Sequence, residues 1–407
     1  MTADIAPMPL GPAGLRRVAI TGLGVVAPAG IGKQGFWAGL LGPGASGGRS
    51  IEIDDWDPSP YFENAKASRR SDRVEQFSLA AASEAFEQAG GVDAIGVDAS
   101  RFGTIFATGV GGLHTLEEQI QIRIEKGERR VSPFLVPMMM TNAAGAAISM
   151  RYGLQGPNET ITTACAAGSH AINYAARLIK WGIVDAVATG GSESAATLTA
   201  LAGFGNMTAL STSGVSQPFA SGRDGFVMGE GSAVLILEEW SRAEARGAHI
   251  LGELLGGASN ADAHHITAPS PGGVGAIACM RAALAESGLE ASDIKQVNAH
   301  GTSTPLNDAA EADAIAAVFG PSAVPVVSTK GVTGHALGAA GALEAAALVL
   351  SIEHELIPPT ANTVEADEGM DIDLVVGEAR AWSPGPAISN NFGFGGHNGS
   401  VVIAPAS

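Results

Sequence analysis

The segment around Cys165 places a single thiol among small residues at the start of a predicted helix. It reads Thr163-Ala-Cys165-Ala-Ala-Gly168, and the apolar spacing that follows predicts a helix that stops near Gly182. A thiol at a helix N-terminus lies beside unpaired N–H groups, which lower its pKa and can hold an oxyanion. Cys165 is therefore either an activated nucleophile or, like most free cysteines, a small buried side chain.

A second segment, residues 297–304, leads from a predicted strand into a turn that carries His300, Gly301 and two threonines. The hydroxyls of Thr302 and Thr304 can bind a polar ligand. An isolated histidine is more often structural than catalytic, but glycine and hydroxyl neighbours at the end of a strand favour a functional role.

A third segment, residues 328–335, has the same strand-to-turn pattern and contains Lys330 and His335 around two glycines. Lysine beside glycine suggests a phosphate-binding loop, but the full Walker spacing is missing and we reject that function. The segment therefore contributes a cation and a second imidazole.

Near the C-terminus, residues 390–398 form a glycine-rich stretch around Phe392 and Phe394. Glycine reaches backbone conformations closed to other residues, so this turn could approach another backbone closely and let an aromatic ring move. The simpler interpretation is a tight turn.

The elements that must position these side chains alternate between strands and helices, which predicts an α/β fold with covered sheets. Predicted helices cover residues 77–88 and 275–287, and predicted strands cover 17–22, 102–108, 186–189 and 325–328. Residues 159–170 and 325–335 both run from a strand into a helix past reactive side chains. This internal similarity indicates two related halves that meet around one site.

Composition excludes several classes of function. The 407 residues are 46% hydrophobic and carry a net charge of −18, which argues against nucleic-acid binding and against lying on an anionic membrane. No apolar run approaches the 18 residues that would span a bilayer. Two cysteines, Cys165 and Cys279, are too few for a disulfide scaffold or a cysteine-rich metal site, so we expect a reducing, cytoplasmic compartment.

Together these segments resemble the β-ketoacyl-[acyl-carrier-protein] synthases, the elongating condensing enzymes of fatty-acid and polyketide synthesis, and most closely synthase II. The resemblance covers nearly the whole chain. It implies the thiolase fold, a five-layered αβαβα arrangement of two similar halves, working as a homodimer. We expect a flexible segment over residues 1–15, an N-terminal half over 16–252 and a C-terminal half over 253–407. The segments that match the family in order are 163–168, 223–231, 298–304, 330–335 and 391–398.

For acyl loading, the resemblance implies that Cys165 takes the acyl group from an acyl carrier protein as a thioester. The backbone N–H groups of Cys165 and Phe394 would form the oxyanion hole. Phe394, in the turn with Phe392, would close over the thiol until an acyl chain displaces it.

For the second substrate, the resemblance implies that His300 and His335 hold the malonyl thioester carbonyl and stabilise the enolate left by decarboxylation. Lys330 would organise the hydrogen-bond network, and Thr302 and Thr304 would bind the phosphopantetheine arm. No metal or other cofactor is expected, because loss of carbon dioxide drives carbon–carbon bond formation.

The activity implied is decarboxylative Claisen condensation of the Cys-bound acyl chain with malonyl-[acyl-carrier protein], giving 3-oxoacyl-[acyl-carrier protein] in fatty-acid elongation. The alternative is the ketosynthase of a type II polyketide or polyene pathway, which could pair with a chain-length-factor-like subunit. A non-catalytic partner subunit is less favoured, since such subunits lack the nucleophile that Cys165 provides.

An acidic carrier protein needs a local basic surface on this acidic chain. Two clusters offer one, although each could equally be a solvated helix face; they are Lys66, Arg69, Arg70 and Arg73, and Arg129 with Arg130. The loop over residues 211–220 is shorter than is common in the family and lacks its charged residues, which puts carrier contacts from that loop in doubt.

Overall fold

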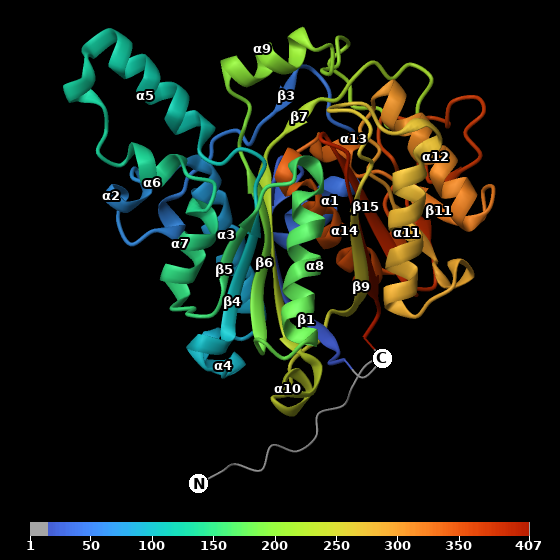
Figure 1. The fold of residues 1–407 in the computed structure, drawn as a ribbon, viewed down its shortest axis with the longest axis horizontal. Coiled ribbons are helices and arrows are strands. Elements are labelled where there is room, and N and C mark those ends of the chain that lie inside the picture. Colours follow the sequence, from blue (N-terminus) through green and yellow to red (C-terminus); the bar gives the residue numbers. More distant parts are fainter. Residues whose placement is uncertain (1–14, 407) are drawn as a thin grey trace.

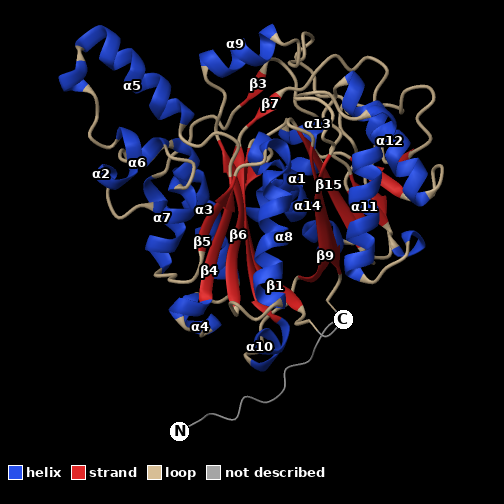
Figure 2. Cartoon of the chain, in the orientation of Figure 1, coloured by secondary structure: helices blue, strands red, loops and turns tan. Residues whose placement is uncertain are grey.

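The chain folds around one long path of hydrogen-bonded strands, here described from a computed structural model for residues 15–406 (Figures 1 and 2). The strand order is β13-β11-β10-β15-β16-β9-β1-β8-β6-β4-β5, with β2 paired to β1. The flexible segment predicted over residues 1–15 lies outside the described residues except for Leu15.

The two ends of this path have the same internal pairing. In the first half, β1 (Val18–Ala27), β8 (Gly231–Glu239) and β6 (Ala186–Glu193) are successively antiparallel, and β4 (Phe102–Ala107) and β5 (Asn158–Ile161) then follow in parallel. The second half repeats the pattern with β9 (Gly252–Ala261), β16 (His397–Ala404), β15 (Ala387–Gly393), β10 (Gln296–Asn298) and β11 (Pro325–Val327), and β13 (Asp373–Leu374) extends it. The predicted duplication is confirmed by this shared topology.

Helices form three layers around the two half-sheets. The middle layer is α8 (Ala167–Lys180) and α14 (Ala340–His354), which pack on each other and on strands of both halves. One outer layer contains α3 (Arg73–Gln88) and α7 (Ala143–Tyr152), and the other contains α11 (Val274–Ser287) and α12 (Pro305–Phe319). This is the expected αβαβα arrangement.

Residues 337–354, which include α14, are long and apolar enough to cross a membrane by length and composition. However, 89% of that stretch is buried inside the fold, where both half-sheets cover it. It is therefore a core element, and no other described helix passes the same test.

Shorter elements surround the layers. The helices are α1 (Gly32–Leu40), α2 (Ala65–Ser68), α4 (Val92–Ile95), α5 (Leu113–Lys126), α6 (Leu135–Met139), α9 (Leu198–Asn206), α10 (Trp240–Ala245) and α13 (Lys330–Thr333). The strands are β2 (Gly30–Ile31), β3 (Ser50–Ile51), β7 (Met228–Gly229), β12 (Leu356–Ile357) and β14 (Arg380–Ala381). In Figure 1, α5 extends furthest from the layers.

The strand predicted over residues 17–22 does not end in a turn at its glycines, because β1 continues through Gly22 and Gly24 to Ala27. A methyl group at Gly22 would lie 2.2 Å from the carbonyl oxygen of Ala85, and one at Gly24 would lie 1.9 Å from that of Ala81. These glycines let α3 pack directly on the strand, so close helix–strand contact explains them better than a turn does.

Candidate active site

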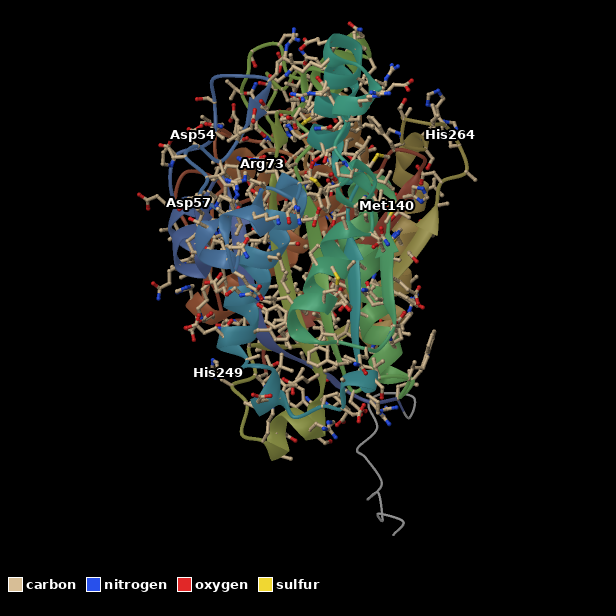
Figure 3. All side chains as sticks on the ribbon, turned by 90° about the vertical axis from the view of Figure 1, so that its left-hand side faces the viewer. Asp54, Asp57, Arg73, Met140, His249 and His264 are labelled. Atoms are coloured by element: carbon tan, nitrogen blue, oxygen red, sulfur yellow. The ribbon has the colours of Figure 1, made fainter. Side chains whose placement is uncertain are left out.

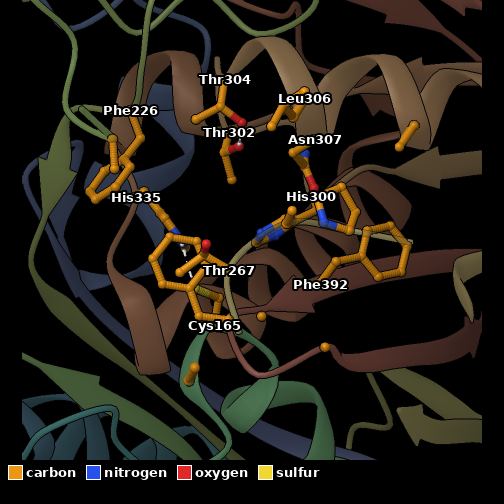
Figure 4. Close-up of a pocket in the computed structure, with 18 of the residues that line it drawn as sticks. Cys165, Phe226, Thr267, His300, Thr302, Thr304, Leu306, Asn307, His335 and Phe392 are labelled. Carbon is orange, nitrogen blue, oxygen red and sulfur yellow. Dashed lines mark hydrogen bonds between the residues drawn. The ribbon is translucent and has the colours of Figure 1, made fainter. Parts of the chain in front are cut away.

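Cys165, His300 and His335 come together at the foot of one cavity of about 560 Å³ (Figure 4). Cys165 lies in the 3₁₀ turn Ala164–Ala166 that connects β5 to α8, His300 follows β10, and His335 follows α13. Their reactive atoms all lie within 4.8 Å of one another, and the three residues are buried. Apolar side chains line the cavity around them, among them Val110, Phe204, Phe226, Leu337 and Phe394.

The topology explains this convergence. β5 and β11 occupy matching places in the two halves, and each leads through a short turn into a middle-layer helix. Cys165 follows the first strand, and Lys330 and His335 follow the second. The internal repeat seen in the sequence therefore places the nucleophile and an imidazole on opposite sides of one centre.

The expectation of a lowered thiol pKa is wrong for this state of the enzyme. Burial raises the pKa of Cys165 to about 11. The positive charge of Lys330 and the N–H groups of Phe394 and of Cys165 itself favour the thiolate, but they do not outweigh the loss of solvent. The site therefore holds a thiol.

His335 is the closest partner of the thiol, with Nε2 lying 3.0 Å from Cys165 Sγ. Its Nδ1 has no hydrogen-bond partner among the described residues. A buried N–H without an acceptor costs more than a lone pair without a donor, so this geometry favours the tautomer with the proton on Nε2. In that form His335 donates toward the sulfur and the cavity.

His300 reaches the same tautomer by a different route. Lys330 Nζ lies 3.3 Å from His300 Nδ1, and the amide nitrogen of Asn391 lies 3.4 Å from the same atom. Both are donors, so Nδ1 accepts and the proton resides on Nε2. Burial, followed by the charge of Lys330, lowers the pKa of both His300 and His335 well below its ordinary value, which keeps the rings neutral.

Lys330 lies behind the histidines and does not line the cavity. Its ammonium group donates to the carbonyl oxygen of His300 at 2.6 Å and forms a buried ion pair with Glu344, which in turn accepts from Asn391 at 2.6 Å. Lys330 therefore lies at the centre of a buried hydrogen-bond network, as its predicted role requires. Glu344 and Asn391 complete it, and sequence reasoning assigned no role to either residue.

The N–H groups of Phe394 and Cys165, predicted as the oxyanion-hole donors, both act to lower the pKa of the Cys165 thiol. The Phe394 ring lines the cavity with its centre 6.4 Å from that of Phe204. Phe392 packs edge-on against His300, with 5.9 Å between the ring centres, so it supports the histidine and is not at the thiol.

Thr302 and Thr304 line the cavity as predicted, and their hydroxyl oxygens lie 2.9 Å apart (Figure 4). Two buried carboxylates on α12 hold their turn in place. Glu311 accepts the N–H groups of His300 and Gly301, each at 2.7 Å, and Asp308 accepts those of Thr302 and Ser303 at 3.0 and 3.1 Å. Their spacing of three residues on a helix was the available signal for this support.

The shortened loop over residues 211–220 is hydrogen-bonded to the two segments that carry His300 and Lys330. Ser216 Oγ donates to the carbonyl oxygen of Lys330 at 2.7 Å, and the N–H of Gln217 donates to Ser303 Oγ at 3.0 Å. Asp224 accepts hydrogen bonds from Ser211, Thr212 and Ser213 in the same loop. The loop therefore supports the catalytic turns.

Of the predicted docking residues, Arg73 (labelled in Figure 3) is half-buried, with 25% of its side chain exposed. Its guanidinium pairs with the fully buried Glu230, with Nε lying 2.9 Å from a carboxylate oxygen, and it also donates to the carbonyl of Ile53. Arg73 cannot leave Glu230 without stranding a buried charge, so its inclusion among the docking residues is corrected. The other five side chains are exposed; they are Lys66, Arg69, Arg70, Arg129 and Arg130.

The two basic clusters lie near each other in space. The Arg70 guanidinium lies 4.1 Å from the centre of the Phe134 ring, and Phe134 directly precedes α6. Arg129 and Arg130 lie five and four residues before Phe134 in the chain. The five exposed basic side chains of the two clusters are called the basic face below.

Thiolate and imidazole are also zinc ligands, so the Cys165, His300 and His335 atoms are of suitable types for a metal. The Lys330 ammonium, 3.3 Å from His300 Nδ1, places a positive charge beside the cluster and opposes a divalent cation there. The arrangement is better suited to holding a developing negative charge.

Comparison with known proteins gives the class. The chain matches the β-ketoacyl synthase N-terminal domain over residues 47–243 and the β-ketoacyl synthase C-terminal domain over residues 251–364. It is 43% identical to 3-oxoacyl-[acyl-carrier-protein] synthase 2 of Synechocystis, covering 95% of this chain and 98% of that protein. The chain therefore belongs to the β-ketoacyl synthase family, and it is a β-ketoacyl synthase enzyme with the thiolase fold.

Solved structures agree with this placement. The ishigamide ketosynthase/chain length factor structure gives a TM-score of 0.91 at 31% identity, and a type II polyketide ketosynthase bound to its acyl-carrier protein gives 0.87 at 31%. Each match covers 97% of this chain and 100% of the other. The family resemblance, the fold and the enzyme class predicted from the sequence are confirmed.

Proposed function

We propose that this β-ketoacyl synthase extends a Cys165-bound acyl chain with malonyl-[acyl-carrier protein], releasing carbon dioxide and giving 3-oxoacyl-[acyl-carrier protein] in fatty-acid elongation. The observation that carries the proposal is the approach of Cys165, His300 and His335 to within 4.8 Å at the foot of an apolar cavity. The activity in the Synechocystis relative's name supports the same assignment.

In the first half-reaction, Cys165 Sγ attacks the thioester carbon of the incoming acyl carrier. The carbonyl oxygen gains charge and accepts from the N–H groups of Cys165 and Phe394. The carbon–sulfur bond to phosphopantetheine then breaks, and its sulfur ends with the proton that the Cys165 thiol has lost. The apolar cavity holds the acyl tail, and the Phe394 ring, which lines this space, is the gate that the tail displaces.

In the second half-reaction, Thr302 and Thr304 hold the phosphopantetheine arm of the malonyl carrier. The bond to the carboxylate breaks, carbon dioxide leaves, and its electron pair forms an enolate whose oxygen accepts from Nε2 of His300 and His335. The enolate carbon then attacks the Cys165 thioester and expels the sulfur, which regains a proton. Every charge in this sequence is held by residues already in place, so no metal or separate cofactor is used.

The alternative is a type II polyketide or polyene ketosynthase. Two structural neighbours support it, one described as a type II polyketide ketosynthase and the other as a ketosynthase/chain length factor. The test is condensation with malonyl carrier and acyl carriers of graded length, with products read by mass spectrometry. A fatty-acid elongase should give one two-carbon extension of saturated chains. Repeated extension without reduction would assign the polyketide function instead.

We propose that the acidic carrier protein docks on the basic face formed by Lys66, Arg69, Arg70, Arg129 and Arg130, whose side chains are exposed. Reversing the charge of Arg69 and Arg70 to Glu should raise the KM for carrier-bound substrate about tenfold while leaving kcat within twofold. The loss should shrink at high salt, because screening weakens exposed charge pairs.

The matched control for docking is Arg281→Glu on α11, in the other outer layer. It is compared with Arg69→Glu alone, because each variant reverses one charge on an exposed arginine. Arg281→Glu should leave KM unchanged. Equal effects of the two reversals would mean that only net charge matters, and unchanged kinetics in the Arg69 and Arg70 variant would place docking elsewhere.

We further propose that two copies of the chain associate through the edge of β5, which ends the strand path and has one unpaired side. An unpaired edge strand is a ready template for another strand. The helix α7, which packs on β5, carries the exposed apolar side chain of Met150. Light scattering should give twice the chain mass of 40.9 kDa, and a mixed pair with a chain-length-factor-like subunit remains the alternative.

We place the enzyme in the cytoplasm, where Cys165 and Cys279, both free, stay reduced.

A further inference from the structure

The His170 side chain joins two segments that are far apart in the chain. It lies one turn into α8, half-buried and outside the cavity lining. Its Nδ1 lies 2.8 Å from Thr163 Oγ1, two residues before the nucleophile, and its Nε2 lies 2.9 Å from the carbonyl oxygen of Asn398 in β16. The imidazole therefore bridges the turn that carries Cys165 and the strand that follows the Phe394 turn.

The partners fix the direction of both hydrogen bonds. A carbonyl oxygen can only accept, so His170 Nε2 carries a proton and donates to Asn398. In the neutral ring, Nδ1 then accepts from the Thr163 hydroxyl. Burial lowers the pKa of His170 from its ordinary value, which agrees with the neutral form.

The two bridged segments carry or adjoin the two N–H groups proposed above as oxyanion donors, those of Cys165 and Phe394. Asn398 in β16 pairs with Phe392 in β15, and Phe392 lies two residues before Phe394. Directly beside Phe394, a methyl group at Gly393 would lie 3.0 Å from the Cys165 nitrogen and 3.1 Å from the Thr163 carbonyl oxygen. The segments thus touch at Gly393.

The other side of the imidazole is equally closely packed. A methyl group at Gly399 would lie 2.9 Å from His170 Cδ2 and 3.2 Å from its Nε2. The ring therefore has little room to shift relative to β16. A hydrogen-bonded ring held this closely can transmit the position of β16 to the nucleophile turn.

We propose that His170 is a positioning residue that holds the Cys165 turn against the β15–β16 segment and so sets the spacing of the two oxyanion donors. The inference rests on the roles proposed above for Cys165 and Phe394. Oxyanion donors act only when they lie within hydrogen-bond distance of the developing charge, so a small displacement has a large effect on rate.

This role separates the two half-reactions. Acyl transfer to Cys165 places its oxyanion between the Cys165 and Phe394 N–H groups, and therefore depends on the bridge. Malonyl decarboxylation places its enolate oxygen at His300 and His335. Lys330 and Asn391 contact the His300 ring, and backbone hydrogen bonds with Val227 and Gly229 hold His335. A general destabilisation of the fold would instead slow both acyl transfer and decarboxylation.

The test is His170→Phe, which keeps a ring and removes both hydrogen bonds. Single-turnover acylation of Cys165 by acyl carrier, followed by intact mass, should slow about 10- to 100-fold, the range between a displaced and a lost donor. Carbon dioxide release from malonyl carrier, measured with the Cys165→Gln background in both arms, should stay within twofold.

Three further variants make the result specific. His170→Gln, whose amide N–H can still reach the Asn398 carbonyl, should recover part of the acylation rate. Thr163→Val removes one end of the bridge with little change in volume, and it should slow acylation in the same direction even if His170→Phe folds poorly. The matched control is Tyr174→Phe, on the same helix as His170. It loses the hydrogen bond from the Tyr174 hydroxyl to Glu159 in β5 and should behave as wild type.

Acylation at the wild-type rate in both His170→Phe and Thr163→Val would overturn the proposal. Equal slowing of acylation and decarboxylation would also overturn it, because that outcome indicates a general structural role. Failure of the wild-type enzyme to form any acyl adduct would instead contradict the proposed function, so the two failures can be told apart.

Discussion

Cys165→Ala should abolish condensation and leave no acyl adduct on the chain. No other thiol can substitute, because Cys279 is fully buried in α11 and lies outside the cavity lining. Intact-mass spectra of wild-type enzyme after incubation with acyl carrier should show one acyl group per chain, and peptide mapping should place it on Cys165. The expected loss exceeds 10⁴-fold, since what remains is substrate binding without a nucleophile.

Cys165→Gln tests whether the two half-reactions are separable. An amide in place of the thiol cannot accept an acyl group, but it leaves His300 and His335 free to bind the malonyl carbonyl, so carbon dioxide release should continue without condensation. Cys279→Ala is the matched control: it removes the other cysteine and should keep both activities. An acyl adduct that persists in Cys165→Ala would contradict the assignment of the nucleophile.

The sequence predicted this centre well because its chemistry is carried by residue types that are rare in the chain and clustered in short segments. Cys165, His300 and His335 each follow a predicted strand, and two of those strands belong to an internal repeat. Repeated strand-to-helix junctions meet at one centre when two halves share a topology, so the convergence could be predicted before the structure was known.

What the sequence could not show were contacts between segments far apart in the chain. Glu344 and Asn391 lie within a continuous apolar helix and a strand, and only the folded chain places both beside Lys330. The prediction that Arg73 is a docking residue was wrong for the same reason. In the sequence Arg73 is one of several neighbouring basic residues, but in the fold it pairs with Glu230, 157 residues further along the chain.

The thiol pKa shows a related limit. A position beside a helix N-terminus favours a thiolate, and that local argument is physically correct. Burial depends on the packing of the entire site, and it raises the pKa of Cys165 to about 11 in spite of the local donors. Local structure could be predicted from the sequence, whereas the balance between local and desolvation effects could not.

His300→Ala and His335→Ala should each lower malonyl decarboxylation about 10²- to 10³-fold, the usual effect of removing one oxyanion donor. Both rings are neutral and each carries its proton on Nε2. Each substitution therefore removes one hydrogen-bond donor to the enolate oxygen. Acylation of Cys165 should persist in both variants. It should slow more in His335→Ala, because of the two histidines it is His335 whose Nε2 lies 3.0 Å from Cys165 Sγ. The measurements are carbon dioxide release and intact mass on the same preparations.

The replacement His335→Asn decides between two ways in which this ring could act. An asparagine amide can still donate an N–H to the enolate oxygen, but it cannot take up a proton at neutral pH. If His335 acts as a donor, His335→Asn should recover at least tenfold of the decarboxylation lost in His335→Ala, whereas a ring that acts as a base would leave the two variants equal. His249→Ala, which removes an exposed histidine, controls for the loss of an imidazole as such and should keep the wild-type rate. Normal malonyl turnover in both alanine variants would remove His300 and His335 from the decarboxylation step altogether, and the enolate would then need donors elsewhere in the cavity.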